Sequence, residues 1–93
     1  MESLSVDLEF VLKYLLSSEL GRELSIEILK TEPSEGKLFV KVDGRDVALE
    51  FPQCKFGEEE KFLKCVSKAV SRDERSLQRV VEVIERALGS TSS

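Results

Sequence analysis

Seven basic side chains in the second half of the chain have the type and spacing that could bind phosphate. They recur at helical spacing and would share a face of about 80° if residues 58–88 stayed in phase. Positive charge along a helix neutralises phosphates, so nucleic-acid contact is one candidate function. No aromatic residue interleaves them to stack on bases, and the chain has a net charge of -4. We therefore expect a solvated face, with phosphate binding as the alternative. This basic stripe consists of Lys61, Lys64, Lys68, Arg72, Arg75, Arg79 and Arg86.

Other constellations that could support catalysis are missing. The chain has no histidine, which removes the commonest general base and metal ligand. The acids at 58–60 are adjacent on a helix and point in different directions, so they do not converge on a site. Glu27, Asp46 and Glu50 are expected on the outer face of a sheet, beside lysines. The sequence thus predicts a protein that is not an enzyme and has no catalytic, cofactor or metal site.

The two cysteines, Cys54 and Cys65, lack metal-site spacing and are too few for a disulfide scaffold. The N-terminus is acidic, unlike a signal peptide, and no apolar run approaches the roughly 20 residues of a membrane span. We therefore expect a cytoplasmic protein with two free thiols, Cys65 being a small core residue.

Abundant Glu, Lys and Arg beside scarce Asn, Gln and Met indicate a thermophilic source, unless chance explains the bias.

Residues 5–20 are expected to form the first helix, with Ser5 as its N-cap and Gly21 as its stop. Its leucines and Val11 form one apolar stripe, whereas Phe10 and Tyr14 lie on another side. The polar strip of this helix consists only of Glu9, Lys13 and Ser17, which is narrow for a surface helix. The helix is therefore expected to be covered on two sides, by its own sheet and by a second partner.

Three alternating segments, 23–30, 37–42 and 45–51, predict antiparallel strands. Residues 31–36 form a loop, and Asp43-Gly44 is a strong signal for a two-residue hairpin turn. That turn pairs residues whose numbers sum to 87, so apolar residues face apolar residues and lysines face acids. The first strand is expected to place Glu27 beside Lys41 and Leu29 beside Phe39.

This register places a short apolar streak on the outer face of the sheet, formed by Leu29, Phe39 and Ala48. It is a contact patch in one interpretation and a set of scattered surface apolars in the other, which is normal for soluble proteins.

Residues 58–88 are helical, as two helices or one. Ser71 and Glu74 match a capping box, which favours two helices with a short break. The alternative is one long or kinked helix of roughly 46 Å, which would leave Asp73 within its apolar arc. We favour two helices.

The order of elements predicts an α+β domain over residues 1–89, with 90–93 as a disordered tail. An N-terminal helix precedes a three-stranded antiparallel meander and two C-terminal helices. Both sheet edges are expected to be open, which favours a homodimer. We expect a small homodimeric protein-interaction module, with Phe10, Tyr14, Leu29, Phe39 and Ala48 as candidate contacts. Residues 1–60 carry 14 acids and 7 bases, so a basic partner is one candidate, and an ordinary dipolar surface is the alternative.

Overall fold

A computed structural model describes residues 3–89, with side chains from residue 7 onward. The chain forms helix α1 (Ser3–Leu20), strands β1 (Ile26–Glu32), β2 (Lys37–Val42) and β3 (Arg45–Glu50), and helices α2 (Glu59–Arg72) and α3 (Glu74–Gly89). Short 3₁₀ turns, η1 (Pro33–Glu35) and η2 (Pro52–Cys54), follow β1 and β3. The predicted α+β architecture is confirmed. The predicted tail 90–93 lies outside what the structure describes. Ser5 is not the N-cap that the sequence predicted, because α1 already begins at Ser3 and Ser5 lies within it.

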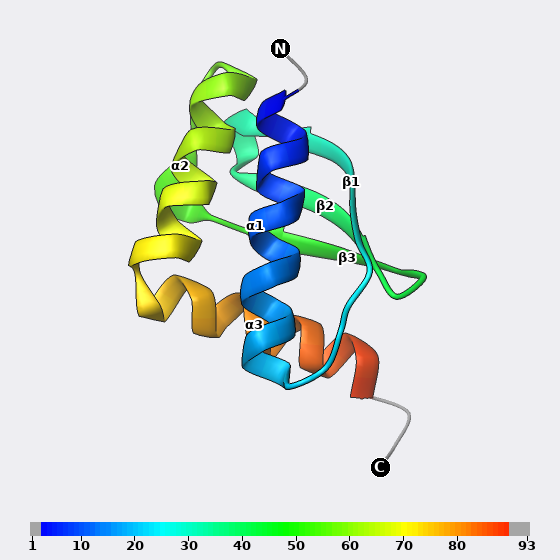
Figure 1. The fold of residues 1–93 in the computed structure, drawn as a ribbon. Helices are drawn as coiled ribbons and strands as arrows, with labels where there is room; N and C mark the ends of the chain where they lie inside the picture. The colour runs from blue at the N-terminus through cyan, green and yellow to red at the C-terminus, as the bar shows by residue number, and fades with distance from the viewer. Residues whose placement is uncertain (1–2, 90–93) are drawn as a thin grey trace.

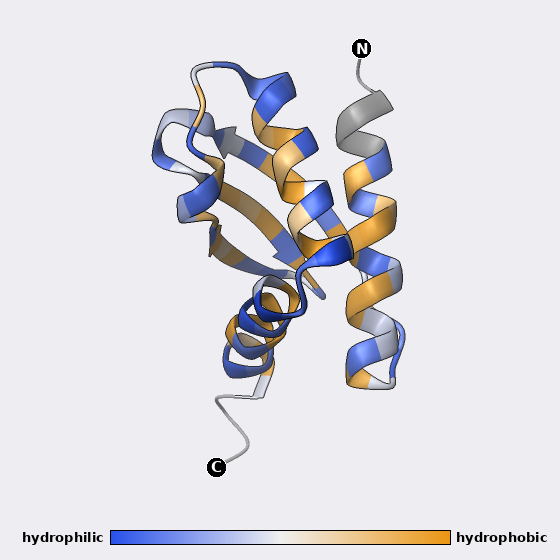
Figure 2. Ribbon diagram, turned by 90° about the vertical axis from the view of Figure 1, so that its left-hand side faces the viewer, coloured by the Kyte–Doolittle hydropathy of each residue, from blue (hydrophilic) through white to orange (hydrophobic). Residues whose placement is uncertain are grey.

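The strands form an antiparallel sheet in the order β1-β2-β3. Helices α1 and α2 lie side by side across one face, and α3 runs across their lower ends beside β3 (Figure 1). Hydrophobic stretches of the strands face those of the helices, and charged segments lie outside (Figure 2). The layers therefore bury one shared core.

The core uses the apolar stripes expected from the sequence. Each helix contributes several aliphatic side chains, and the strands contribute alternate residues. Among the largest fully buried side chains are Phe51, Phe62, Leu12, Leu16, Leu38 and Ile84.

The predicted hairpin register is confirmed at every pair, from Lys37 opposite Glu50 to Lys41 opposite Asp46. Asp43 and Gly44 both have positive φ, at 51° and 86°, as a type I′ turn requires. The Asp43 carboxylate also accepts a hydrogen bond from the Ser25 N–H and pairs with Arg22. The turn is thereby tied to the chain entering β1.

The first strand departs from its expected register. Glu27 lies opposite Lys41 as predicted, but a bulge between Ile28 and Lys30 places Lys30, not Leu29, opposite Phe39. The strand also begins later and ends later than the predicted segment 23–30. The predicted pairing of Leu29 with Phe39 is wrong, because the alternation pattern cannot reveal an inserted residue.

The second half forms two helices, as favoured. The predicted capping box is wrong, since Ser71 belongs to the last turn of α2. Asp73 is extended, and its carboxylate accepts hydrogen bonds from the Arg75 N–H and the Ser76 hydroxyl. In one continuous helix, Asp73 would lie within the apolar arc. In the structure it caps α3 instead.

Candidate functional site

The two cysteines form a disulfide, so the prediction of free thiols is wrong. Cys54 is fully buried in η2, and its bond to Cys65 fastens this turn to α2 with Cα atoms 5.6 Å apart. Free thiols were expected because the cytoplasm is reducing. The sequence pattern did not reveal that η2 turns Cys54 back toward α2. Neither sulfur is available as a nucleophile in this state. Within residues 3–89, no three His, Cys, Asp or Glu residues gather as metal ligands.

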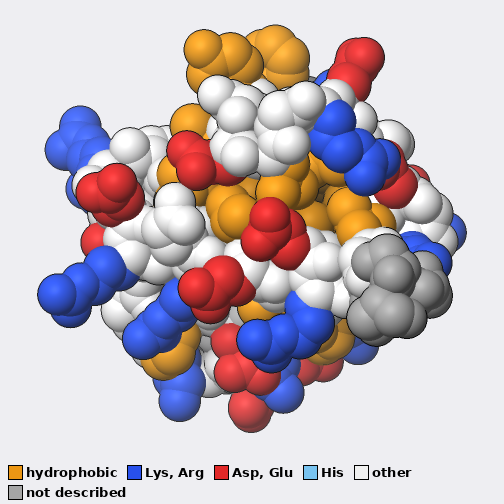
Figure 3. Space-filling view, turned by 90° about the horizontal axis from the view of Figure 1, so that it is seen from below, with side chains coloured by type: hydrophobic (Ala, Val, Ile, Leu, Met, Phe, Trp, Pro, Cys, Tyr) orange, Lys and Arg blue, Asp and Glu red, His pale blue; other side chains and the backbone are white. Residues whose placement is uncertain are grey.

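Two aromatic side chains on α1 are the most exposed large hydrophobic groups of the described chain. Phe10 is 73% and Tyr14 72% exposed. They lie one helical turn apart, on the side of α1 turned away from the core. Beside them is a shallow hollow of about 430 Å³, lined mainly by apolar surface and including Ser17, Ser18 and Arg22. Seen from below, hydrophobic side chains also reach the surface between charged ones (Figure 3).

The apolar streak expected on the outer face of the sheet is altered by the bulge in β1, which places Lys30 rather than Leu29 opposite Phe39. Leu29 is 42% exposed at the bulge, and Ala48 is exposed. Phe39 is partly buried, and the Lys30 ammonium lies 5.1 Å from the centre of its ring. A cation over the ring covers apolar surface that the predicted patch would have offered.

The basic stripe is divided by the break at Asp73. The direction of the chain changes there, and α3 leaves α2 at a wide angle (Figure 1). Lys64, Lys68 and Arg72 line a hollow beside Asp7 of α1. Arg75 and Arg79 lie on α3 in a separate hollow with two glutamates. The assumption that both helical segments stay in phase is wrong, so the stripe is not one continuous surface.

The two edges of the sheet differ, contrary to the expectation that both are open. At β1, the Glu9 carboxylate accepts a hydrogen bond from the Ile28 N–H at 2.8 Å. Just before the strand, the Ser17 hydroxyl accepts one from the Leu24 N–H at 3.0 Å. The polar strip of α1 therefore covers part of this edge.

At β3 the hairpin register directs the N–H and C=O groups of Asp46, Ala48 and Glu50 away from β2. No hydrogen bond to these outward groups is present in the described chain. This edge is open along its middle.

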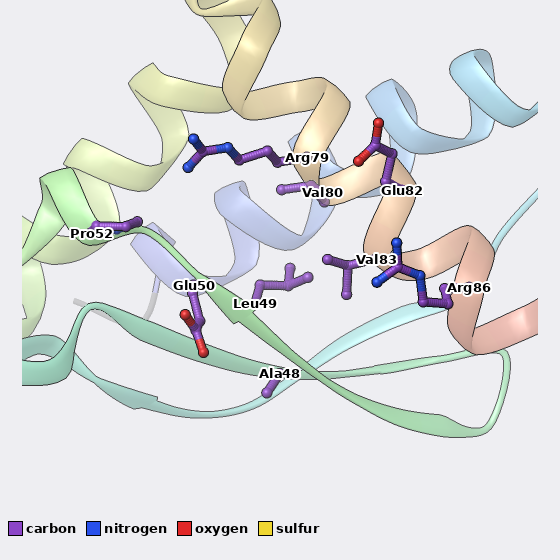
Figure 4. Close-up of a pocket in the computed structure, with 9 residues that line it drawn as sticks. All are labelled: Ala48, Leu49, Glu50, Pro52, Arg79, Val80, Glu82, Val83 and Arg86. Carbon is purple, nitrogen blue, oxygen red and sulfur yellow. The ribbon is translucent and has the colours of Figure 1, made fainter.

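A groove of about 300 Å³ runs between the open edge of β3 and helix α3 (Figure 4). Leu49, Val80 and Val83 form its apolar part, of which Leu49 and Val80 are buried beneath the groove and Val83 is 37% exposed. The side chains of Glu50 and Glu82 point away from the space between strand and helix (Figure 4). The Arg45 guanidinium donates to the Ala87 carbonyl, tying the hairpin end of β3 to the end of α3. Sequence reasoning missed this groove, because it depends on where α3 lies after the break.

No protein-family model, no curated protein and no solved structure matches this chain. None of the described helices is long and apolar enough to cross a membrane. A functional assignment therefore depends on the α1 aromatic pair, the divided basic stripe and the β3–α3 groove.

Proposed function

We propose that the protein is a non-catalytic interaction module that forms a homodimer through α1. The observation that carries the proposal is the exposure of Phe10 and Tyr14, side by side on one helix. Exposed aromatic groups on an otherwise charged surface are typical of protein contact sites.

A second copy of α1 fits this face when the two helices run antiparallel. With Tyr14 near the twofold axis, the Phe10 ring of each copy meets the Ser17–Ser18 end of the other. Those small side chains line the hollow beside the aromatic pair. The face is thus complementary to itself, as an isologous dimer requires.

The direction of α1 favours the same arrangement. Antiparallel packing places the two helix dipoles side by side in opposite directions, whereas parallel packing would place their like ends together.

Light scattering coupled to size exclusion tests the dimer. We expect a mass about twice 10.5 kDa for the wild type and a single chain for the double variant Phe10→Ser, Tyr14→Ser.

Leu29→Ser is the matched control. It removes a second exposed hydrophobic side chain on the far side of the sheet and should leave the dimer mass unchanged. A monomeric wild type at micromolar concentration, or a dimer dissociated by the control alone, would contradict the proposal.

The disulfide is compatible with a cytoplasmic protein if its source is heat-adapted, as the composition indicates. Intracellular proteins of hyperthermophiles are rich in disulfides, whereas those of mesophiles are not. We infer the two properties together.

A further inference from the structure

We infer that the open edge of β3 binds an extended peptide with two basic residues four positions apart and apolar residues between them. The peptide would add a fourth strand to the sheet and place alternate side chains in the β3–α3 groove. This inference supplies a partner for the proposed interaction module, and it does not require the dimer.

Backbone geometry provides the first argument. The outward N–H and C=O groups of Asp46, Ala48 and Glu50 form the unpaired rim of an edge strand. Five residues of strand are about 17 Å long, which suits a short extended segment. The opposite edge is partly covered by α1 through Glu9, so strand addition is directed to β3.

Charge provides the second argument. Asp46 and Glu50 are exposed on the outer side of this edge, and neither carboxylate forms a salt bridge within the described residues. An added strand would place one residue opposite each acid, with a third residue opposite Ala48. Basic residues at the first and fifth positions of the peptide would therefore meet both acids.

The groove provides the third argument. The second and fourth residues of the peptide would point inward, toward Leu49, Val80 and Val83. Apolar side chains suit this floor. Arg79 and Arg86 lie along the helical wall, so they would repel bases at these two positions.

The chain already contains a strand of this pattern on the other side of β3. Residues 37–41 of β2 read Lys-Leu-Phe-Val-Lys, and the two lysines lie opposite Glu50 and Asp46. Because side chains alternate between the same two faces on both sides of β3, the outer edge should accept the same pattern. A second copy of β3 suits it less well, since pairing centred on Ala48 would place Asp46 opposite Glu50.

The test is a fluorescence anisotropy titration with the labelled, end-blocked peptide Lys-Leu-Phe-Val-Lys. We expect saturable binding, and at least tenfold weaker binding of Glu-Leu-Phe-Val-Glu. The double variant Asp46→Asn, Glu50→Gln should weaken binding of the lysine peptide about tenfold. The control variant Glu58→Gln, Glu59→Gln removes the same charge away from the groove and should bind as the wild type does.

N-methylated peptides separate strand pairing from charge attraction. Methylating the central Phe nitrogen, which would face β3, should abolish binding, whereas methylating the following Val nitrogen should not. Amide chemical shifts should change at residues 46–50 and along α3. Equal binding of both charge patterns, insensitivity to methylation, or shifts centred on β1 would overturn the inference.

The monomeric Phe10→Ser, Tyr14→Ser variant keeps the two proposals apart. It should bind the lysine peptide as tightly as the wild type. If the peptide instead dissociates the wild-type dimer, the β3 edge belongs to the dimer interface and the proposal of a dimer through α1 is wrong. If the wild type is a monomer but binds the peptide as expected, only the dimer proposal fails.

Discussion

Glu9 and Ser17 lie eight residues apart on α1, and both accept hydrogen bonds from the chain that forms β1. The sequence indicated a narrow polar strip but not its purpose. An edge strand has unpaired N–H groups, and each one shielded from water without a partner would cost about 1–3 kcal/mol. Glu9 removes that cost for the Ile28 N–H of β1, and Ser17 removes it for the Leu24 N–H just before the strand. The unpaired backbone groups that an added strand could bind therefore lie at the β3 edge.

Gly36 is a position where a single methyl group should matter. Its φ is 69°, and a Cβ there would lie 2.6 Å from the Phe51 carbonyl oxygen, whose residue also donates its N–H to the Gly36 carbonyl. We expect Gly36→Ala to lower the free energy of unfolding by about 2–4 kcal/mol, through backbone strain and close contact. Urea denaturation followed by circular dichroism measures the change.

Two other glycines serve as controls for this substitution. Gly21 has the same φ but open space, so Gly21→Ala should cost about 1 kcal/mol, from strain alone. Gly57 has neither constraint, and Gly57→Ala should stay within about 0.5 kcal/mol of the wild type. Equal losses at all three positions would show that the contact with Phe51 is unimportant.

At the scale of elements, the break between α2 and α3 determines where functional groups lie. It turns α3 toward β3, which creates the groove and divides the basic stripe. The break depends on Asp73, whose carboxylate holds the first turn of α3. An apolar arc that continues through residues 58–88 would otherwise be compatible with one helix.

Asp73→Ala should lower the free energy of unfolding by about 1–2 kcal/mol, because it removes the cap of α3. Ser71→Ala is the matched comparison, since Ser71 is exposed in α2, and should change stability by no more than about 0.5 kcal/mol. Thermal or urea unfolding of both variants distinguishes the two capping schemes. A greater loss for Ser71→Ala would favour the capping box instead.

The sequence predicted the elements well because periodicity and turn residues are local signals. The hairpin register followed from Asp43-Gly44 and complementary pairs. The bulge at β1 and the disulfide did not follow, since an inserted residue leaves alternation plausible and cysteine spacing says little about which side a turn faces. The exposed aromatic pair was anticipated as a separate side of α1. The groove was not, because its two walls lie 30 residues apart and meet only through tertiary packing.

At the scale of the whole molecule, the Cys54–Cys65 bond fastens the connection between sheet and helices. A chain of this length has a small core, so each constraint forms a large part of its net stability. The bond holds η2 against α2. It thereby fixes the path of the chain from β3 to the helical layer.

Replacing both cysteines with serine should lower the free energy of unfolding by about 2–3 kcal/mol, because the unfolded chain regains freedom over a short loop. Urea denaturation measures the loss, and wild type in reductant should match the variant. Wild type equally stable with and without reductant would contradict this account. A thermal midpoint of the oxidised protein within about 45–65 °C would contradict heat adaptation.

The unequal sheet edges have a consequence for assembly. A sheet can extend through many molecules only if each molecule pairs with a strand at one edge and leaves its other edge unpaired for the next molecule. Here α1 blocks part of one side through Glu9, and the acids of β3 discourage a second copy on the other. Under the proposed peptide binding, each molecule would accept one added strand. Such a limit permits recognition of a partner while protecting a crowded solution of these chains from fibre formation.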